Sequence, residues 1–346
     1  MKVDYIIVGL GLAGLAFIEE LMTAKKTFVV FEDDSQTSSL VAGGVYNPVI
    51  LKRYTPVWNA KEQLKVALPF YQRIEKKLSI KVDEKFIIKK VFKSIEDQNN
   101  WFSAIDKPKL SGFLNPVLDS QTYPGVVADF DFGNVNEAGR IDTKKLVHSY
   151  REYLKEKELI HFESFQYDCI DFHKDHISYK HIIANRIVFC EGFGIVKNPF
   201  FNYLPLNEAK GELLTIYAPA LDINFLLKST LFILPIGNHH YKVGATFNWT
   251  DKTSNPSKEG KQELVDKLKK VISVPYRIVS QSAGIRPTVA GRRPLVGRHP
   301  EHPQLSVLNG LGTRGVMIAP TVAKNLFNHL EKEEILDAEI DINRFH

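Results

Sequence analysis

Two short apolar runs near the start of the chain lie on either side of a stretch with helical spacing. Residues 3–8 are almost all apolar, and residues 27–31 form a second run that ends on Glu32. Apolar runs of this length without alternation are typical of parallel strands buried on both faces. The residues between them, to about Leu21, have the spacing of an amphipathic helix. The pattern therefore predicts a strand–helix–strand unit.

The loop that opens this helix has the sequence Gly-Leu-Gly-Leu-Ala-Gly, at residues 9–14. In a Gly-x-Gly-x-x-Gly loop, the first glycine makes a tight turn, the second lets the backbone approach a pyrophosphate, and the third lets helix and sheet pack closely. The helix N-terminus offers N–H groups to phosphates. Glu32 follows the second strand and can accept hydrogen bonds from ribose hydroxyls, while it would repel a 2′-phosphate. We therefore predict a dinucleotide site for NAD or FAD rather than NADP.

The middle of the chain changes between amphipathic helices and short strands. Helices are predicted at residues 61–78, from residue 143 with Asp142 as N-cap, and at residues 258–271. Strands are predicted at residues 86–92, 125–130, 159–165, 186–190, 210–217, 231–234 and 241–247.

Between residues 81 and 132 we expect only short strands and turns. The lysines of this stretch are expected to be solvated on an exposed sheet face; they are Lys81, Lys85, Lys89, Lys90 and Lys93. The adjacent histidines at positions 239 and 240 lack further ligand partners in sequence, so they predict a hairpin tip rather than a metal site.

A second strand–loop–helix unit lies near the C-terminus. Residues 305–309 are predicted as a strand, residues 310–315 form a glycine-rich loop, and residues 319–330 have helical spacing. One helix N-terminus suits a pyrophosphate. The other suits the pyrimidine end of a flavin, which carries negative charge when it is reduced. Two such units favour FAD over NAD.

Length, charge and cysteine content set wider limits. At 346 residues the chain can form two domains or one large one. A net charge of +5 permits contact with anions without requiring nucleic acid. Cys169 and Cys190 belong to no metal-binding cluster, so we expect neither a zinc site nor a disulfide framework. The chain begins with a strand and has no long apolar run, so we expect no signal peptide, no membrane partner and a cytoplasmic location.

Four segments together resemble the D-amino acid oxidase family of flavoproteins, which includes glycine oxidase and sarcosine oxidase. They are residues 9–14 with Glu32, residues 38–48, residues 189–192, and residues 284–287 followed by 310–316. The resemblance implies an α/β plus α+β fold, in which a Rossmann-like FAD-binding domain carries an inserted mixed β-sheet domain that caps the substrate. The FAD-binding domain would comprise residues 1–78, 139–204 and 284–346, and the cap domain residues 79–138 and 205–283.

The resemblance also implies cofactor contacts. The first glycine loop would hold the pyrophosphate, Glu32 the adenosine ribose, Ser38 and Ser39 phosphate or ribityl oxygens, and the second glycine loop the pyrimidine O2. The implied site for non-covalent FAD comprises Gly9, Gly11, Leu12, Ala13, Gly14, Glu32, Asp33, Ser38, Ser39, Ala42, Gly43, Gly44, Val45, Cys190, Glu191, Gly192, Gly312, Thr313, Arg314, Gly315 and Val316.

Arg286 matches the family arginine that pairs bidentately with a substrate carboxylate, although a structural pair beneath the flavin stays open as an alternative. Arg314 is a further candidate for contact with substrate or flavin. The chain departs from the family at Thr313, where glycine oxidases have an arginine, and at Phe232, which aligns with a tyrosine that often helps to bind the carboxylate. No cysteine lies near residues 310–316, so covalent attachment of flavin is not expected.

These features support a leading hypothesis and three alternatives. The leading one is an oxidase or dehydrogenase that oxidises the C–N bond of a small amine or amino acid by hydride transfer to flavin N5, with oxygen or another acceptor reoxidising the flavin. The second is a flavoenzyme that modifies a carboxymethylaminomethyl-uridine-like group in tRNA, because residues 44–48 and 310–315 also resemble that kind of enzyme. The third is a flavoprotein with a binding role only, and the fourth is an NAD dehydrogenase. The substrate and the oligomeric state stay open.

Overall fold

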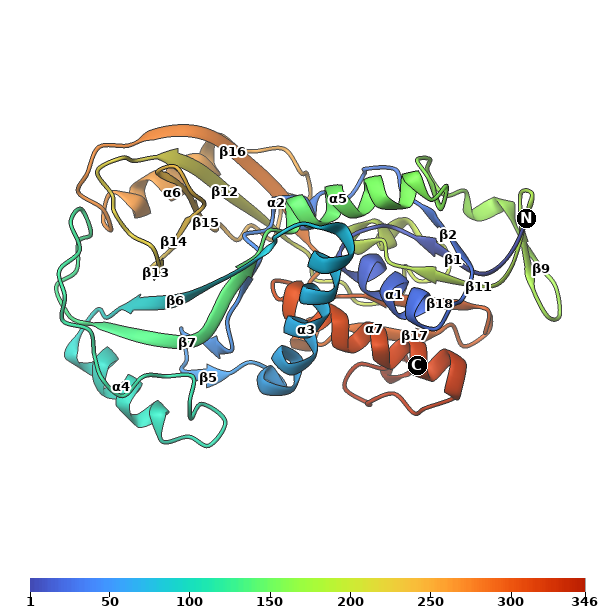
Figure 1. The fold of residues 1–346 in the computed structure, drawn as a ribbon, viewed down its shortest axis with the longest axis horizontal. Coiled ribbons are helices and arrows are strands. Elements are labelled where there is room, and N and C mark those ends of the chain that lie inside the picture. The colour runs from blue at the N-terminus through green and yellow to red at the C-terminus, as the bar shows by residue number, and fades with distance from the viewer. Residues whose placement is uncertain (346) are drawn as a thin grey trace.

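The strands of the chain form two large sheets and one small one (Figure 1). The structure is a computed structural model that describes residues 1–345. The first sheet has the order β17-β18-β11-β1-β2-β8, with β10 and β9 added beside β11. Its strands are β1 (Lys2–Val8), β2 (Phe28–Phe31), β8 (Ile160–His161), β9 (Ile170–Phe172), β10 (Ile177–Tyr179), β11 (Ile182–Phe189), β17 (Leu295–Arg298) and β18 (Leu305–Asn309).

The predicted strand–helix–strand unit lies at the centre of this sheet. β1 pairs in parallel with β2 on one side and with β11 on the other, and β11 pairs in parallel with β18. Helix α1 (Leu12–Thr23) connects β1 to β2. The side chains of β1 from Tyr5 to Val8 are almost fully buried, as a strand covered on both faces requires. This part of the sequence-based prediction is confirmed.

Four helices gather beside the first sheet (Figure 1). They are α1, α3 (Ala60–Leu78), α5 (Thr143–Glu156) and α7 (Gly315–Lys332), and α7 packs against both α1 and α3. The predicted N-cap of α5 is confirmed, because the Asp142 carboxylate accepts a hydrogen bond of 3.0 Å from the Lys145 amide. The helix buries Leu146, Tyr150 and Leu154 on its inner face.

The second sheet has the order β16-β12-β15-β14-β13-β6-β7-β3 and is mixed, since β13 runs parallel to β6 while the other neighbours are antiparallel. Its strands are β3 (Val45–Tyr46), β6 (Asp83–Val91), β7 (Phe132–Ile141), β12 (Ala209–Tyr217), β13 (Leu226–Lys228), β14 (Phe232–Pro235), β15 (His240–Gly244) and β16 (Arg277–Arg286). Helix α6 (Lys258–Leu268) packs against β12 and β15 through Leu264 and Leu268. The predicted α/β plus α+β fold agrees with these two sheets.

The remaining elements are short. They are α2 (Ser38–Val41), α4 (Ile95–Ile105), the small sheet of β4 (Val49–Ile50) and β5 (Thr55–Pro56), and the 3₁₀ helices η1 (Tyr167–Cys169), η2 (Gly192–Lys197), η3 (Ala290–Arg292) and η4 (Ile342–Phe345). The two adjacent histidines lie at the β14–β15 hairpin tip, as predicted. Residues 1–345 contain no helix with the length and apolar character needed to cross a membrane.

Two expectations about the secondary structure of residues 81–132 are wrong. Residues 125–130 form no strand, because Gly125 turns the chain at φ +81° and Val126 makes only an isolated bridge to Ile272. Residues 95–105 form helix α4 rather than turns, and the Ser94 hydroxyl caps this helix by accepting a hydrogen bond of 3.1 Å from the Asp97 amide. The motif Ser-x-x-Asp was a signal for this helix.

The lysines of β6 are also placed differently from the expectation. Lys81, Lys85 and Lys93 are exposed, but Lys89 and Lys90 are buried. Lys89 pairs with Asp119 and Lys90 pairs with Asp97. The partner carboxylates come from a loop and from α4, so spacing along β6 does not reveal them.

Candidate cofactor and substrate site

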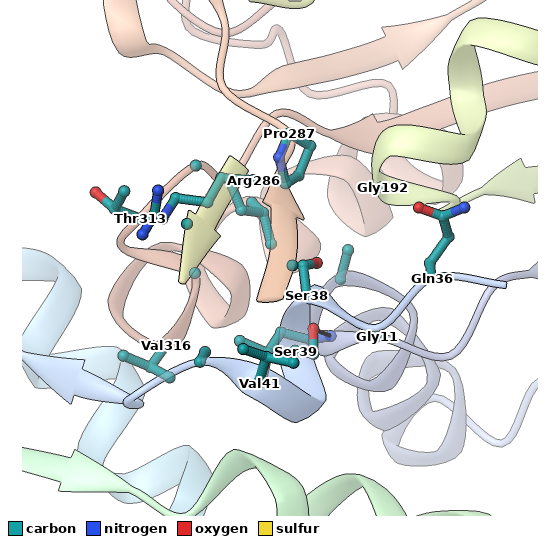
Figure 2. Close-up of a pocket in the computed structure, with 18 of the residues that line it drawn as sticks. Gly11, Gln36, Ser38, Ser39, Val41, Gly192, Arg286, Pro287, Thr313 and Val316 are labelled. Carbon is teal, nitrogen blue, oxygen red and sulfur yellow. Dashed lines mark hydrogen bonds between the residues drawn. The ribbon is translucent and has the colours of Figure 1, made fainter. Parts of the chain in front are cut away.

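A cavity of about 780 Å³ extends between the glycine loops of the first sheet and one face of the second sheet. Figure 2 shows residues from both glycine-loop regions around it, with Gly11, Ser38 and Ser39 near the first loop and Thr313 and Val316 on the second. The sequence-predicted residues that line the cavity are Gly9, Gly11, Leu12, Ala13, Glu32, Asp33, Ser38, Ser39, Ala42, Gly43, Gly44, Val45, Cys190, Glu191, Gly192, Arg286, Gly312, Thr313, Arg314, Gly315 and Val316.

Gly14 is the one residue of the predicted site that does not line the cavity. A Cβ atom at Gly14 would lie 2.1 Å from the Gly9 carbonyl oxygen, so glycine here allows α1 to approach the loop. Gly9 itself has φ +95°, a left-handed conformation that favours glycine. The third glycine of the motif therefore acts on packing, while the first two face the cavity.

The N-terminus of α1 is open to the cavity. The helix has no side-chain N-cap, and the Leu12 amide donates a weak hydrogen bond of 3.3 Å to the Ser39 hydroxyl. The first amides of a helix carry partial positive charge and seek an acceptor. This end of the cavity can therefore hold an anion such as a pyrophosphate.

Glu32 is buried at the end of β2, where its carboxylate is fixed by three donors. It accepts hydrogen bonds from the amides of Leu10 and Asp34 and from the Arg151 guanidinium, the last at 3.0 Å. Burial raises the pKa of Glu32 against the effect of these donors, which lower it. A carboxylate has about four lone-pair positions, so about one is left for a ligand hydroxyl.

Arg151 was missed by the sequence reasoning. It lies on the inner face of α5, four residues after Val147 and three before Leu154, both of which are buried. A charged residue at a core position of an amphipathic helix is a signal for a buried partner. Here that partner is Glu32, and Asp34 pairs with the other side of the same guanidinium.

Glu191 follows β11 and is also buried. Its carboxylate accepts a hydrogen bond of 2.7 Å from the Asn198 amide group and another from the Tyr167 hydroxyl. Burial raises the pKa of Glu191 to about 7. This side chain therefore changes its charge near neutral pH at the wall of the cavity.

The second glycine loop leads into α7, whose N-terminus also has no side-chain cap. Gly312 has φ +57°, and its amide donates a hydrogen bond of 3.1 Å to the Pro287 carbonyl oxygen. Arg314 donates a hydrogen bond of 3.0 Å to the Asn47 carbonyl oxygen, which ties this loop to the segment after β3. Burial, with a smaller effect of Arg292, lowers the pKa of Arg314 to about 10, so it stays charged.

Arg286 lies at the end of β16, and its guanidinium lies over Gly211 of β12. A Cβ atom at Gly211 would come within 1.8 Å of the guanidinium Nη2, so only glycine leaves room for it there. The guanidinium lies 4.4 Å from the centre of the Phe247 ring and makes long hydrogen bonds of 3.3 and 3.4 Å to the Thr246 carbonyl oxygen.

Arg286 has no carboxylate partner within residues 1–345. Burial lowers its pKa to about 10, so it remains protonated at neutral pH. A guanidinium has five N–H donors, and its fork geometry matches a carboxylate. Arg286 is therefore a charged group in the cavity with most of its donors unused.

The wall of the cavity formed by the second sheet includes several apolar residues, of which the sequence analysis named only Phe232. They come from the second sheet and its turns, and include Leu213, Leu226, Phe232, Ala245 and Phe247. Phe232 lies beside Gly43, where a Cβ atom would be 3.4 Å from the end of its ring. These residues are far apart in sequence, so only strand pairing brings them to one wall.

The residues present fit FAD. The two uncapped helix N-termini reach the cavity at separate places, and the glycines at 9, 11, 43 and 312 leave the backbone open towards it. One N-terminus matches the charge of a pyrophosphate and the other that of a reduced flavin.

Comparisons with known proteins support this assignment at the level of the family. A family model described as FAD dependent oxidoreductase (DAO) matches residues 4–328. Glycine oxidase from Bacillus subtilis (strain 168) is 26% identical over 159 residues, which are 44% of this chain and 42% of that protein. The tRNA 5-methylaminomethyl-2-thiouridine biosynthesis bifunctional protein MnmC from Idiomarina loihiensis is 26% identical over 151 residues, 41% of this chain and 25% of that protein. The matches therefore span less than half the length of these relatives.

Solved structures share the fold along almost the whole chain. Iminodiacetate oxidase from Chelativorans sp. BNC1 has a TM-score of 0.79 at 14% identity and covers 99% of this chain and 98% of its own. Glycine oxidase from Geobacillus kaustophilus has a TM-score of 0.77 at 17% identity, with 99% and 98% covered. L-α-glycerophosphate oxidase from Mycoplasma pneumoniae, with FAD bound, has a TM-score of 0.76 at 15% identity, with 95% of each chain covered.

These findings confirm the resemblance read from the four sequence segments, and with it the cofactor and the fold class. The family model spans nearly the whole chain, and the cavity offers FAD a matching set of backbone donors. The chain belongs to the DAO family of FAD-dependent oxidoreductases.

Proposed function

We propose that this flavoenzyme oxidises the C–N bond of an amine that carries a carboxylate, such as an amino acid or an N-substituted glycine. The observation that carries the proposal is Arg286, a charged guanidinium in the cavity with unused donors and no carboxylate partner within residues 1–345. A substrate carboxylate would accept hydrogen bonds from the unused donors of Arg286, in the bidentate geometry that guanidinium favours.

The side chains have roles in binding and orientation rather than in acid–base chemistry. Arg286 would hold the carboxylate, and the Phe247 ring beneath it would fix the plane of the guanidinium. Leu213 and Phe232 would exclude water from the reacting carbon. If the amine binds in its neutral form, the reaction needs no strong base. Bound FAD would supply the two-electron acceptor for this oxidation, which removes a hydride from the carbon and a proton from the nitrogen and leaves an imine for hydrolysis, and oxygen or another acceptor would reoxidise the flavin.

The other predicted contacts belong to the same proposal. The first glycine loop and α1 would hold the pyrophosphate, Glu32 the ribose, and residues 312–316 the pyrimidine ring of the flavin. The proposal also includes the two domains. Residues 1–78, 139–204 and 284–346 would bind FAD, and residues 79–138 and 205–283 would cover the substrate. The names of the similar proteins, glycine oxidase and iminodiacetate oxidase, support an amine with a carboxylate as the substrate class.

A second candidate is a tRNA-modifying flavoenzyme. The partial match to the bifunctional tRNA-modifying protein favours it. Its substrate would also carry a carboxymethylamino group, so Arg286 would have the same role in either case. The glycerophosphate oxidase among the structural neighbours has the same fold, so the fold by itself does not select a C–N bond.

The test follows the flavin absorbance of the holoenzyme without oxygen while candidate substrates are added one at a time. The panel contains glycine, sarcosine, D-alanine, D-proline, longer N-substituted glycines and undermodified tRNA. We expect rapid bleaching by at least one carboxylated small amine. Bleaching by tRNA alone would support the second candidate, and a bound flavin that no member of the panel bleaches would contradict both enzymatic proposals.

The matched variants are Arg286→Met and Arg277→Met. Arg277 lies on the same strand, β16, but is exposed and stacks on Tyr217 outside the cavity. We expect Arg286→Met to retain FAD and to lose bleaching by carboxylated amines, while Arg277→Met behaves as the wild type. Bleaching of Arg286→Met at the wild-type rate would contradict the proposed role of Arg286 in holding the carboxylate.

A further inference from the structure

Lys228 is a second cation on the substrate side of the cavity that the proposed function does not use. It is the last residue of β13, it lines the cavity, and it is only partly exposed. Its ammonium group has no hydrogen-bond or ion-pair partner among residues 1–345, whereas Lys89 and Lys90 on the neighbouring strand are both paired with aspartates. A partly buried ammonium without an anion is costly, so its presence requires a reason.

The register of the second sheet places Lys228 on the same face as the apolar walls of the cavity. Lys228 pairs with Phe232, Phe232 pairs with Gly244, and Gly244 pairs with Leu213. Residues opposite each other in antiparallel strands point to the same face of the sheet. Leu227 points to the other face, where it packs in the cluster beneath α6. Lys228 and Phe232 therefore point into one space.

The distance between Lys228 and Arg286 sets the size of a molecule that can bind both. The Arg286 guanidinium lies over Gly211, two residues along β12 from Leu213. From β12 to β13 there are three strand spacings, or about 14 Å. The lysine side chain covers part of this distance. Glycine has only two carbons and is too short to contact both cations, but a longer molecule can do so.

The charges around Lys228 favour an anion. Burial, with smaller effects of Lys90, Lys93 and Lys267, lowers its pKa to about 8. Two of these neighbours have their own carboxylate partners, since Lys90 pairs with Asp97 at 2.6 Å and Lys267 pairs with Glu263 of α6. Lys267 and Glu263 also line the cavity, but as an ion pair. Lys93 is exposed to solvent. Lys228 is thus the cation in this group that faces the cavity and lacks a counter-charge within residues 1–345.

We infer that Lys228 binds a second, remote carboxylate of the substrate, so that the substrate class is a dicarboxylic secondary amine with one carboxymethyl group. Arg286 holds the carboxylate of the carboxymethyl group, and the reacting C–N bond lies between the two cations over the apolar wall formed by Leu213 and Phe232. This inference rests on the proposed function. Lys228 is only partly exposed and shares its face of the sheet with Leu213 and Phe232, which favours a small molecule over an RNA phosphate.

A series of substrates of increasing length tests the inference. The series consists of sarcosine and of N-(ω-carboxyalkyl)glycines with one to five methylene groups before the second carboxylate. The measured quantity is the second-order rate constant for anaerobic bleaching of the flavin in the holoenzyme. We expect the best diacid to exceed sarcosine by about tenfold or more, as a hydrogen bond between two charged groups provides.

The variant Lys228→Met removes the ammonium and keeps an unbranched side chain. We expect it to lose the gain of the best diacid and to change the rate with sarcosine by less than about twofold. The control Lys269→Met changes an exposed lysine of the turn after α6 and should retain the gain. Equal losses with sarcosine and with the diacids, or a series without any gain over sarcosine, would overturn the inference.

A binding measurement separates this inference from the proposed function. In the thioether analogues of the series, sulfur replaces the amine nitrogen, so they carry the same carboxylates and have no C–N bond to oxidise. Their dissociation constants are measured from the change in the spectrum of the oxidised flavin. We expect the best dicarboxylic thioether to bind about tenfold more tightly than (methylthio)acetate, and only in proteins that contain Lys228.

If this preference is present while no amine bleaches the flavin, the proposed function fails and the Lys228 site stands. If amines bleach the flavin and the preference is absent, the Lys228 site fails alone. Bleaching by undermodified tRNA without any preference among the thioethers would replace the small diacid with an RNA.

Discussion

The two ends of the cavity are built in different ways. The proposed cofactor end is formed largely by backbone, with two glycine loops and two uncapped helix N-termini from single, continuous sequence motifs. The substrate end is formed by side chains from β12, β13, β14 and β16 and the turns between them, which meet through strand pairing. A backbone site binds groups common to every FAD molecule, whereas a side-chain site can change its ligand by single substitutions. The first end therefore carries the family signal and the second end the specificity.

The largest effect is expected at the cofactor end, from Gly14→Ala. The added Cβ would lie 2.1 Å from the Gly9 carbonyl oxygen, so α1 has to move away from the loop. We expect loss of bound FAD and a decrease of about 1–3 kcal/mol or more in the free energy of unfolding, measured by urea denaturation. The control is Gly112→Ala, whose added Cβ meets no atom but whose φ of +85° makes alanine unfavourable by about 1 kcal/mol. Retention of FAD, rather than stability, therefore separates the two variants. Retention of FAD by Gly14→Ala would show that the loop does not need this close approach.

The corresponding change at the substrate end is Gly211→Ala. Its Cβ would lie within 1.8 Å of the Arg286 guanidinium and would displace it. We expect kcat/KM for a carboxylated amine to fall about 100-fold, the amount that a charge-assisted bidentate contact provides, with FAD content unchanged. Loss of FAD in this variant would mean that the two ends are not independent.

A smaller effect is expected from Glu32→Gln, which changes charge and leaves size unchanged. The amide cannot match the three donors that fix the carboxylate, and its NH₂ group offers no acceptor to the ribose. We expect FAD affinity to fall about tenfold, as for one lost charge-assisted hydrogen bond, when apoprotein is titrated with FAD. Glu156→Gln, at an exposed acid of α5 outside the cavity, provides the comparison, and an equal loss there would point to overall charge rather than to the contact.

The last expected effect is spread over a range of pH and concerns Glu191. Its pKa is raised to about 7 in the folded protein, above the usual value of about 4.5, so the folded state binds the proton more tightly. This contribution to stability is complete below about pH 4.5 and is lost as the pH rises through 7. We expect the free energy of unfolding to decrease by at most about 1.4 kcal/mol per pH unit in this window. Glu191→Gln should flatten the slope between pH 5 and 7, and an unchanged slope would assign it to other groups.

The same difference between the two ends explains what could be predicted from the sequence. The loop at residues 9–14, the cap at Asp142 and the second glycine loop are local features, because the residues that make each contact are close in sequence. The sequence analysis found all of them, and the family with them. Arg286 was found through resemblance, and its position over Gly211 depends on the pairing of β12 with β16.

The residues that were missed depend on long-range partners. Arg151 meets Glu32 across 119 positions of sequence, and Lys90 is buried because α4 supplies Asp97. Lysine is usually a surface residue, so the sequence gives no sign that Lys228 faces a cavity. Only the strand register that pairs it with Phe232 shows this. Helix α4 is different, because the Ser94 cap is a local signal. The sequence analysis did not use this cap when it assigned short strands and turns to the region.

The order of the strands in the first sheet has a consequence for synthesis on the ribosome. β1 is made first, but its neighbour β11 ends at Phe189, and the sheet is extended by β18, which ends at Asn309. At a translation rate of roughly 5–20 residues per second, about 15–60 s pass between the synthesis of β1 and that of β18. For this time a buried apolar strand and the first glycine loop are present without the second loop. FAD can therefore bind to its complete site only after nearly the whole chain has been translated, and the nascent chain needs protection from aggregation until then.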